Sequence, residues 1–343
     1  MKLRIGIIGT GRRGKDHIRQ LVKRDDVVVT AVCDIVREVA DEAARIAGAP
    51  RIYVDYREML DKETLDAVIV ATPAPVHAGP AVLALQKGLN VMCEKPLAWS
   101  LRDALRIVDA AQGSRGLCEV GYQYRHNPAV GLALERLGGS GIALVRGFYY
   151  HTVPLVESIK DVRTGGGQIF DQVTHLIDLS RVFAGDVVKV YSRYTRNARG
   201  PEEFNNWDGY AVTYEYKSGA VGNFSSTYAL FLGHGEPPTL DIIGREVLVR
   251  FAGSKLIVVT PKGREEFGPE TEGFTVTTDI IGDFVTAVAT GDRSLIKSPP
   301  GDAINSLAAT IAANMSAQTG QIICTDELIE RARSGEEVPA LLE

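Results

Sequence analysis

The chain has 343 residues, of which 45% are hydrophobic and 24% are charged, and its 38 Lys and Arg against 43 Asp and Glu give a formal net charge of -5. These proportions exclude a disordered or fibrous chain and are typical of a globular protein of two domains. Because there is no basic surplus to neutralise phosphates, nucleic acid and anionic membranes are poor partners, and we expect a small-molecule ligand.

The four cysteines are scattered without a C-x-x-C pair, at Cys33, Cys93, Cys118 and Cys324. This spacing argues against a disulfide framework and against a zinc site, so we expect no metal and a reducing compartment, the cytoplasm. The N-terminal residues lead into an apolar strand without a signal-peptide core, and no apolar run approaches the length of a membrane span.

Up to Gly121 the chain alternates short β-branched runs with longer helical periods. The expected strands are Leu3 to Gly9, Val27 to Asp34, Leu65 to Thr72, Asn90 to Glu94 and Leu117 to Gly121. The expected helices are Arg12 to Lys23, Val36 to Ala47, Val76 to Lys87, with Gly88 as its C-terminal cap, and Leu101 to Ala111. This alternation predicts a doubly wound parallel sheet in a first domain, residues 1–121.

After Gly121 the pattern changes to strands that follow one another directly. We expect helices at Ala129 to Leu137, Asp171 to Phe183, Asp279 to Thr290 and Asp302 to Thr319. The expected strands are Val145 to His151, Lys189 to Thr195, Tyr210 to Tyr216, Ala220 to Tyr228, Thr239 to Ile243, Glu246 to Phe251 and Lys255 to Thr260. Residues 122–343 are therefore predicted to form an α+β domain with a large, open, mostly antiparallel sheet. Its uncovered face predicts a homo-oligomer, a dimer or a tetramer.

The first chemical motif is Gly9-Thr10-Gly11-Arg12-Arg13-Gly14, which is G-x-G-x-x-G between the first strand and the first helix. In this position the glycines permit a tight turn, a close approach to a pyrophosphate and tight helix packing, so the motif predicts a dinucleotide site rather than a glycine-rich turn with no ligand.

Asp34 ends the second strand, 20 residues after Gly14, where a carboxylate accepts hydrogen bonds from ribose hydroxyls. It favours NAD over NADP, although Arg37 lies near enough to meet a 2′-phosphate. The alternative is an acidic cap for the next helix.

Two further segments follow strands that end at the ligand-binding edge of the predicted sheet. Ala71-Thr72-Pro73 is expected to border the nicotinamide, and His77 is either a cofactor contact or a surface histidine. Glu94-Lys95-Pro96 brings Lys95 to the same edge, unless it is a solvated lysine before a rigid turn.

A third cluster follows the triplet Gly165-Gly166-Gly167. Asp171, His175 and Asp178 are spaced to share one face of the predicted helix, where a carboxylate beside an imidazole is able to hold a hydroxyl and relay its proton. The alternative is a helix whose polar face meets solvent.

Together these motifs resemble the Gfo/Idh/MocA family, the glucose-fructose oxidoreductase and inositol dehydrogenase superfamily. The resemblance rests on the glycine turn, Glu94-Lys95-Pro96, the segment from Gly121 through Tyr122, Gln123, Tyr124 and Arg125 to Pro128, the glycine triplet with Asp171 and His175, and the closing segment Ser316 to Gln321. It implies a Rossmann domain followed by an α/β domain with an open sheet, in agreement with the pattern.

The resemblance also implies NAD(P)-dependent oxidation of a secondary alcohol on a sugar or cyclitol, with Lys95, Asp171 and His175 as the catalytic group. The cofactor is then held by Gly9, Thr10, Gly11, Arg12, Arg13, Asp34, Ala71, Thr72, Pro73, His77, Glu94, Lys95 and Gln123. Here Gln172-Val173-Thr174 separates Asp171 from His175 where many members have glycine and a small apolar residue, which alters the pocket wall.

Substrate contacts are expected from Lys95, Asp171 and His175, with Tyr122 and Arg125 as wall residues. Strand ends and loops of the second domain add Tyr149, Tyr150, His151, Asn206, Trp207 and Asp208, of which Tyr150 and Trp207 are the chosen candidates. Two alternatives stay open: an enzyme that retains NAD and cleaves glycosides through transient oxidation, and a non-catalytic NAD sensor.

Overall fold

The computed structural model describes residues 2–48, 51–154, 156–200, 202, 204–231, 235–271 and 278–342. The chain divides into two compact units. Unit 1 contains the chain up to Tyr122 together with Asp279–Ile304, and unit 2 contains Gln123–Thr278 together with the chain from Asn305 onward.

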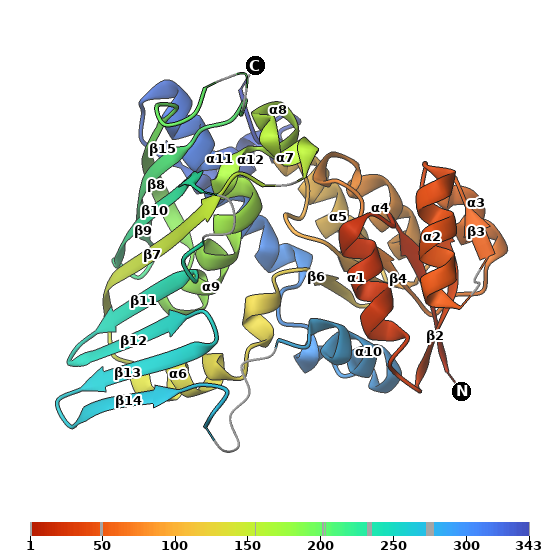
Figure 1. Ribbon diagram of the computed structural model, residues 1–343, viewed down its shortest axis with the longest axis horizontal. Helices are drawn as coiled ribbons and strands as arrows, with labels where there is room; N and C mark the ends of the chain where they lie inside the picture. The colour runs from red at the N-terminus through yellow and green to blue at the C-terminus, as the bar shows by residue number, and fades with distance from the viewer. Residues whose placement is uncertain are drawn as a thin grey trace. The chain divides into compact units, whose positions relative to one another are not determined.

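Unit 1 is built on a six-stranded parallel sheet (Figure 1). Its strands are β1 (Leu3–Ile8), β2 (Val27–Cys33), β3 (Arg51–Tyr53), β4 (Ala67–Val70), β5 (Asn90–Cys93) and β6 (Cys118–Val120). Its helices are α1 (Arg12–Leu21), α2 (Arg37–Ala47), α3 (Tyr56–Lys62), η1 (Ala74–Val76), α4 (Ala78–Gln86), α5 (Leu101–Gly113), α10 (Ile280–Thr290) and η4 (Arg293–Leu295). The strand order β3-β2-β1-β4-β5-β6 reverses direction between β1 and β4, which is the doubly wound topology that the sequence predicted.

The sequence missed β3 and α3 because both are short. Three residues of strand and seven of helix are too few to establish a hydrophobic period. The helix is marked instead by its N-cap Asp55, whose side chain accepts a hydrogen bond from the Arg57 N–H.

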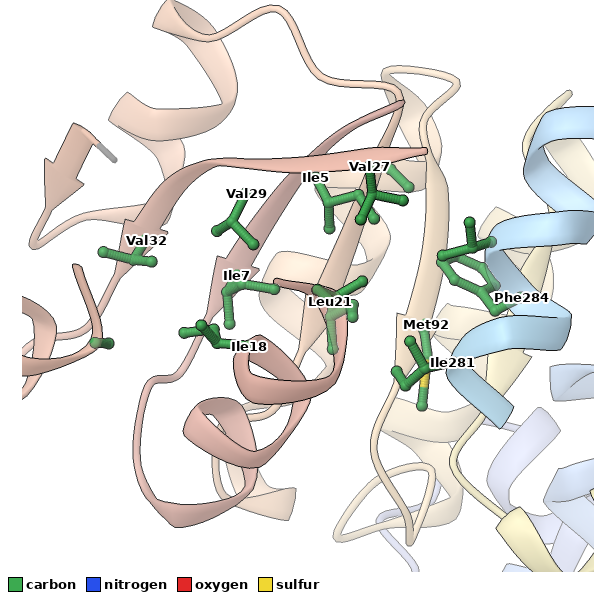
Figure 2. Close-up of a cluster of buried hydrophobic side chains, with 14 of the residues drawn as sticks. Ile5, Ile7, Ile18, Leu21, Val27, Val29, Val32, Met92, Ile281 and Phe284 are labelled. Atoms are coloured by element: carbon green, nitrogen blue, oxygen red, sulfur yellow. The ribbon is translucent and has the colours of Figure 1, made fainter. Parts of the chain in front are cut away.

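Helix α10 lies in unit 1, whereas we expected everything after residue 121 to form the second domain. Its apolar residues Ile280, Ile281, Phe284 and Val285 join the core that packs against the sheet. Figure 2 shows Ile281 and Phe284 beside Met92, with Leu21 of α1 nearby. Burying this apolar face against unit 1 is what draws the late segment back to the first unit.

Unit 2 is built on a nine-stranded sheet of order β14-β13-β12-β11-β7-β10-β9-β8-β15. Its strands are β7 (Ile142–Thr152), β8 (Val187–Thr195), β9 (Gly209–Tyr216), β10 (Val221–Leu230), β11 (Thr239–Gly244), β12 (Val247–Ala252), β13 (Lys255–Thr260), β14 (Gly263–Phe267) and β15 (Ile323–Cys324). Neighbouring strands are antiparallel except for β7 and β10, which confirms the mostly antiparallel sheet.

Helices α6 (Ala129–Leu137) and α9 (Thr174–Ala184) pack against this sheet, as Figure 1 shows. The other helices of unit 2 are η2 (Gln123–His126), α7 (Glu157–Lys160), α8 (Val162–Gly165), η3 (Ile169–Val173) and α12 (Thr325–Arg333). The long helix α11 (Pro300–Thr319) begins in unit 1 and continues in unit 2. Burial alternates along β9, where Tyr210, Val212, Tyr214 and Tyr216 are buried.

Candidate active site

The glycine turn lies where the strand order of unit 1 reverses. Gly9 has φ +85°, and a Cβ built on it would approach the Thr72 nitrogen to 2.5 Å, so the loops after β1 and β4 touch at this point. A Cβ on Gly14 would lie 2.1 Å from the Gly9 carbonyl oxygen. A Cβ on Gly11 would meet nothing within 4 Å. The first and third glycines are thus required by the fold, and the second leaves open space in front of α1.

This arrangement fits a dinucleotide. The N-terminus of α1 begins at Arg12, immediately after Gly11, so its free N–H groups and dipole are available to a pyrophosphate. Arg12 is exposed at the first position of this helix.

Asp34 holds the glycine turn and the start of α2 together. Its Oδ2 accepts the Thr10 N–H at 2.8 Å, and its Oδ1 accepts the Val36 N–H at 3.0 Å. The N-cap of α2 is Val36, so Asp34 lies two residues ahead of the capping position. The carboxylate is half-buried directly after the end of β2.

His77 is not the surface histidine that was one of its two interpretations. It is 1% exposed, and its ring lies between two carbonyl oxygens. Nδ1 is 3.0 Å from the Pro96 oxygen, and Nε2 is 2.7 Å from the Thr72 oxygen. Burial lowers the pKa of His77, against the opposing effect of these carbonyls.

Glu94 is buried between α1 and the turn that carries Lys95. Its Oε1 accepts hydrogen bonds from Arg13 Nη2 at 2.9 Å and from His17 Nε2 at 2.7 Å, and its Oε2 accepts the Lys95 N–H at 3.2 Å. Burial alone would raise the pKa of Glu94, but the His17 hydrogen bond and the charges of His17, Arg13 and Lys95 outweigh it and hold this pKa well below its ordinary value. Lys95 itself is half-buried and precedes a cis Pro96.

In unit 2, Asp171 and His175 lie in two different kinds of helix. Residues Ile169–Val173 form a π-helical turn, and α9 begins at Thr174, whereas we expected one regular helix from Asp171. A π turn inserts an extra residue into the helical ladder and so changes which residues align along the helix. Both side chains are half-buried.

Two tyrosines complete the surroundings of this pair. The Tyr124 ring lies 5.0 Å from the His175 ring, centroid to centroid. Burial raises the pKa of Tyr149, and the neighbouring charge of Asp171 raises it further. Tyr124 belongs to the segment that carried the resemblance but was not a predicted site residue, because its contact with His175 joins η2 to α9 across 50 residues of chain.

Tyr150, the candidate chosen from β7, lies on the other face of the sheet. Its ring stacks on Phe148 at 5.0 Å, and its hydroxyl is 2.8 Å from Ser225 Oγ. Because successive side chains of a strand point to opposite faces, Tyr149 faces Asp171 and Tyr150 does not. Of the two neighbouring candidates, Tyr149 is therefore the one on the side of Asp171.

Three other candidates are committed to packing. Tyr122 is fully buried. Trp207 packs edge-on against Tyr194 at 5.1 Å, beside Gly167. Arg125 makes two 2.7 Å hydrogen bonds to the buried carboxylate of Asp178. Gln123, a predicted cofactor contact, is half-buried at the start of η2.

The remaining loop candidates have structural partners as well. Asn206 donates to the Ile159 carbonyl at 2.9 Å. Asp208 accepts the N–H groups of Ala198 and Arg199 at 2.6 and 2.9 Å. These contacts shape the loop before β9.

Two domain models of one protein family match this chain. Residues 3–122 match the model described as oxidoreductase family, NAD-binding Rossmann fold, and residues 142–250 match the GFO/IDH/MocA C-terminal domain. The chain thus carries the family's NAD-binding domain, and the resemblance seen in the sequence is confirmed. Within the residues that the structure describes, no helix has the length and apolar character needed to cross a bilayer.

Several relatives are named as dehydrogenases. An inositol 2-dehydrogenase of Streptomyces avermitilis is 31% identical over 268 residues, which cover 76% of each chain. An inositol 2-dehydrogenase/D-chiro-inositol 3-dehydrogenase of Shouchella clausii is 41% identical over 209 residues, or 58% of this chain. That match spans 59% of the Shouchella protein, and matches with two inositol 2-dehydrogenases of Saccharopolyspora erythraea span 65% of each, so the chain covers just under two thirds of these relatives.

The fold has close neighbours among solved structures. A levoglucosan dehydrogenase in complex with NADH superimposes with a TM-score of 0.82 and 24% identity, covering 95% of this chain and 99% of that one. With both units matched by models of one family, the chain belongs to the Gfo/Idh/MocA family of oxidoreductases.

Proposed function

We propose that this protein is an NAD-dependent oxidoreductase that oxidises a secondary alcohol of a sugar, a cyclitol or a sugar derivative. The observation that carries the proposal is that Asp171 and His175 lie four residues apart in unit 2 and are both half-buried, while Lys95 of unit 1 lies in the turn that follows β5. Relatives named for inositol and levoglucosan support this class of substrate.

The residues then divide the chemistry among them. His175 accepts the proton of the substrate hydroxyl as the general base. Lys95 donates a hydrogen bond to the same oxygen and stabilises the negative charge that develops there. Asp171 orients the substrate or the imidazole. Bound NAD supplies the acceptor for the hydride that leaves the carbon, so that the alcohol becomes a carbonyl group.

Asp34 supports NAD rather than NADP. The backbone N–H groups of Thr10 and Val36 fix its carboxylate, so its charge stays at the end of β2, where it opposes a 2′-phosphate. Arg37, the residue able to meet that phosphate, pairs with Asp41 at 2.9 Å on the surface of α2.

The test is absorbance in the reduced-nicotinamide band while the protein is offered NAD or NADP with inositols, other polyols, glycosides and anhydrosugars. We expect a signal with NAD that falls about 1000-fold or more in Lys95→Ala and His175→Ala. Glycoside cleavage without net NADH would favour the enzyme that retains its cofactor. NAD binding without NADH formation and without glycoside cleavage would favour a non-catalytic NAD sensor.

A second copy of the chain is the proposed occupant of the open face of the unit 2 sheet. Strand register aligns Val259, Leu248, Ile243, Leu144 and Val221 in one row across five strands on that face. Val221 and Val259 are 47% and 38% exposed. An apolar row of this length favours self-association.

Sedimentation velocity tests this assembly. We expect an oligomer that Leu144→Asp converts to monomer, while Val28→Asp, at an exposed valine of unit 1, leaves it unchanged. A monomeric wild-type protein would contradict the proposal.

Because all four cysteines are free thiols, we also assign the protein to the reducing cytoplasm.

A further inference from the structure

Two buried histidines flank the turn that carries Lys95, and neither is given a role by the reaction proposed above. His17 and His77 are each 1% exposed. His17 belongs to α1, the helix that follows the glycine turn, and His77 lies between η1 and α4. His17 thus follows the glycine turn after β1, and His77 follows the loop after β4.

His17 acts on the turn through Glu94. A ring nitrogen 2.7 Å from a carboxylate oxygen carries a proton, because two acceptors at that distance repel, so Nε2 donates to Glu94 Oε1. The other oxygen of Glu94 accepts the Lys95 N–H at 3.2 Å. Glu94 thus joins α1 to the backbone of Lys95.

The hydrogen bond to Glu94 accounts for the presence of a histidine at position 17. Its Nδ1 is buried and has no hydrogen-bond partner within the part of the chain that the structure describes. A leucine of similar size would avoid that buried polar atom, so the ring nitrogen is retained at a cost. Arg13 adds a second donor to the same Oε1, but from a side chain that is 39% exposed.

His77 holds the other side of the turn. Its ring nitrogens face the Pro96 and Thr72 carbonyl oxygens at 3.0 and 2.7 Å. The neutral ring donates to one of these oxygens and fastens one segment, and the protonated ring donates to both and fastens both. Thr72 is the residue whose backbone touches Gly9.

We infer that His17 and His77 are positioning residues that fix Lys95 relative to the dinucleotide turn, His17 through Glu94 and His77 through Pro96 and Thr72. The inference rests on the proposed role of Lys95. Its physical content is that a lysine on a flexible four-carbon stem stabilises a developing charge only if its backbone is held still. The four contacts are those of His17 with Glu94, of Glu94 with the Lys95 N–H, and of His77 with Pro96 and Thr72. They connect the backbone at Lys95 to α1 and to the loop after β4, which also contacts the dinucleotide turn.

The first experiment compares His17→Leu, His17→Gln and Lys15→Gln. The leucine removes the donor, the glutamine restores an N–H at about the same reach, and Lys15→Gln removes the Glu42 ion pair from the same helix without touching Glu94. We expect kcat to fall by about 10- to 100-fold in His17→Leu, with a small change in the Kd of NAD, and to recover in His17→Gln. Lys15→Gln should behave as wild type.

A second measurement reports on Lys95 without turnover. Lysines are reductively methylated with carbon-13 formaldehyde, and the Lys95 signal is assigned by its loss in Lys95→Arg. We expect this signal to shift in His17→Leu and in His77→Leu, and to stay in place in His17→Gln and Lys15→Gln. If His17→Leu does not fold, Glu94→Gln serves in its place, because it keeps the side-chain shape and removes the charge that His17 contacts.

The outcomes separate the two proposals. Full activity in Lys95→Ala would remove the proposed function. An inactive Lys95→Ala together with wild-type kcat and an unmoved Lys95 signal in His17→Leu and His77→Leu would overturn the positioning role alone. Equal losses in His17→Leu and His17→Gln at wild-type melting temperature would overturn it too.

Discussion

Each unit holds a buried carboxylate close to a candidate catalytic residue, but the two carboxylates are held in different ways. Glu94 precedes Lys95, and its partners Arg13 and His17 both come from the neighbouring helix α1. Asp178 lies one turn after His175, and its partners come from η2 and α11. Glu94 is held at the carboxyl edge of the parallel sheet, whereas Asp178 is held where η2, α9 and α11 pack together.

The Asp178 site is the more enclosed of the two. The carboxylate is 0% exposed and accepts two hydrogen bonds from Arg125 and one from Ser306, each at 2.7 Å. Arg181 Nη1 lies 3.7 Å away and donates to Ser306. This network fastens η2, which carries Tyr124, against the helix that carries His175, so charge pairing in unit 2 supports an aromatic contact.

We expect the largest loss of stability at the buried ion pair of Asp178 and Arg125. Asp178→Leu leaves the Arg125 guanidinium buried without its carboxylate, which should lower the free energy of unfolding by about 3 to 5 kcal/mol. Urea unfolding measures it. The double variant Asp178→Leu, Arg125→Met should recover most of the loss, since it replaces both charges with apolar groups. A double variant as unstable as the single one would show that the pair is not the source.

The glycine turn provides a matched test in unit 1. Gly14→Ala places a methyl group 2.1 Å from the Gly9 oxygen and should lower the free energy of unfolding by about 1 to 3 kcal/mol. Gly11→Ala meets no atom within 4 Å, and its φ of -61° suits alanine, so stability should be unchanged. Its methyl group instead fills the space assigned to the pyrophosphate.

Thermal melting and NAD titration distinguish these outcomes. We expect Gly11→Ala to melt with wild type while its Kd for NAD rises at least about 10-fold, or about 1.4 kcal/mol. Wild-type NAD affinity in Gly11→Ala would show that the dinucleotide does not approach this glycine.

Asp34→Asn tests cofactor choice at constant shape. The amide keeps one acceptor oxygen for the turn but loses the charge that opposes a 2′-phosphate, so the ratio of kcat/KM for NADP to that for NAD should rise about 10-fold. An unchanged ratio would assign the preference to another residue.

The smallest effect is the pH dependence of the contribution that Glu94 makes to stability. The pKa of Glu94 is lowered in the folded chain, so its charge stabilises the fold at pH above its ordinary value of 4.5, and this contribution is lost as the pH falls below that value. The stability difference between wild type and Glu94→Gln should therefore shrink on acidification from neutral pH. Melting curves between neutral pH and about pH 3.5 measure it, and a constant difference would contradict the role of the ion cluster.

Local patterns predicted much of unit 1 and of the strand content of unit 2. β-Branched runs, helical periods and G-x-G-x-x-G are encoded in consecutive residues, so the parallel sheet, the turn and the place of Lys95 after β5 could be read directly. Asp171 and His175 were also identified together, because they are four residues apart. The short elements β3 and β15 lacked enough residues to show a period.

Contacts between distant segments could not be predicted in this way. The sequence by itself determined the fold class and the dinucleotide turn, because each depends on residues close together in the chain, and the resemblance to the family implied the catalytic roles of Lys95, Asp171 and His175. Only the tertiary structure decided that α10 joins unit 1, that Tyr149 rather than Tyr150 faces Asp171, that Arg125 pairs with Asp178 and that His17 contacts Glu94. The physical reason is that burial and charge pairing are settled by which surfaces meet in the folded chain, and partners 53 or 77 residues apart leave no periodic trace in the sequence.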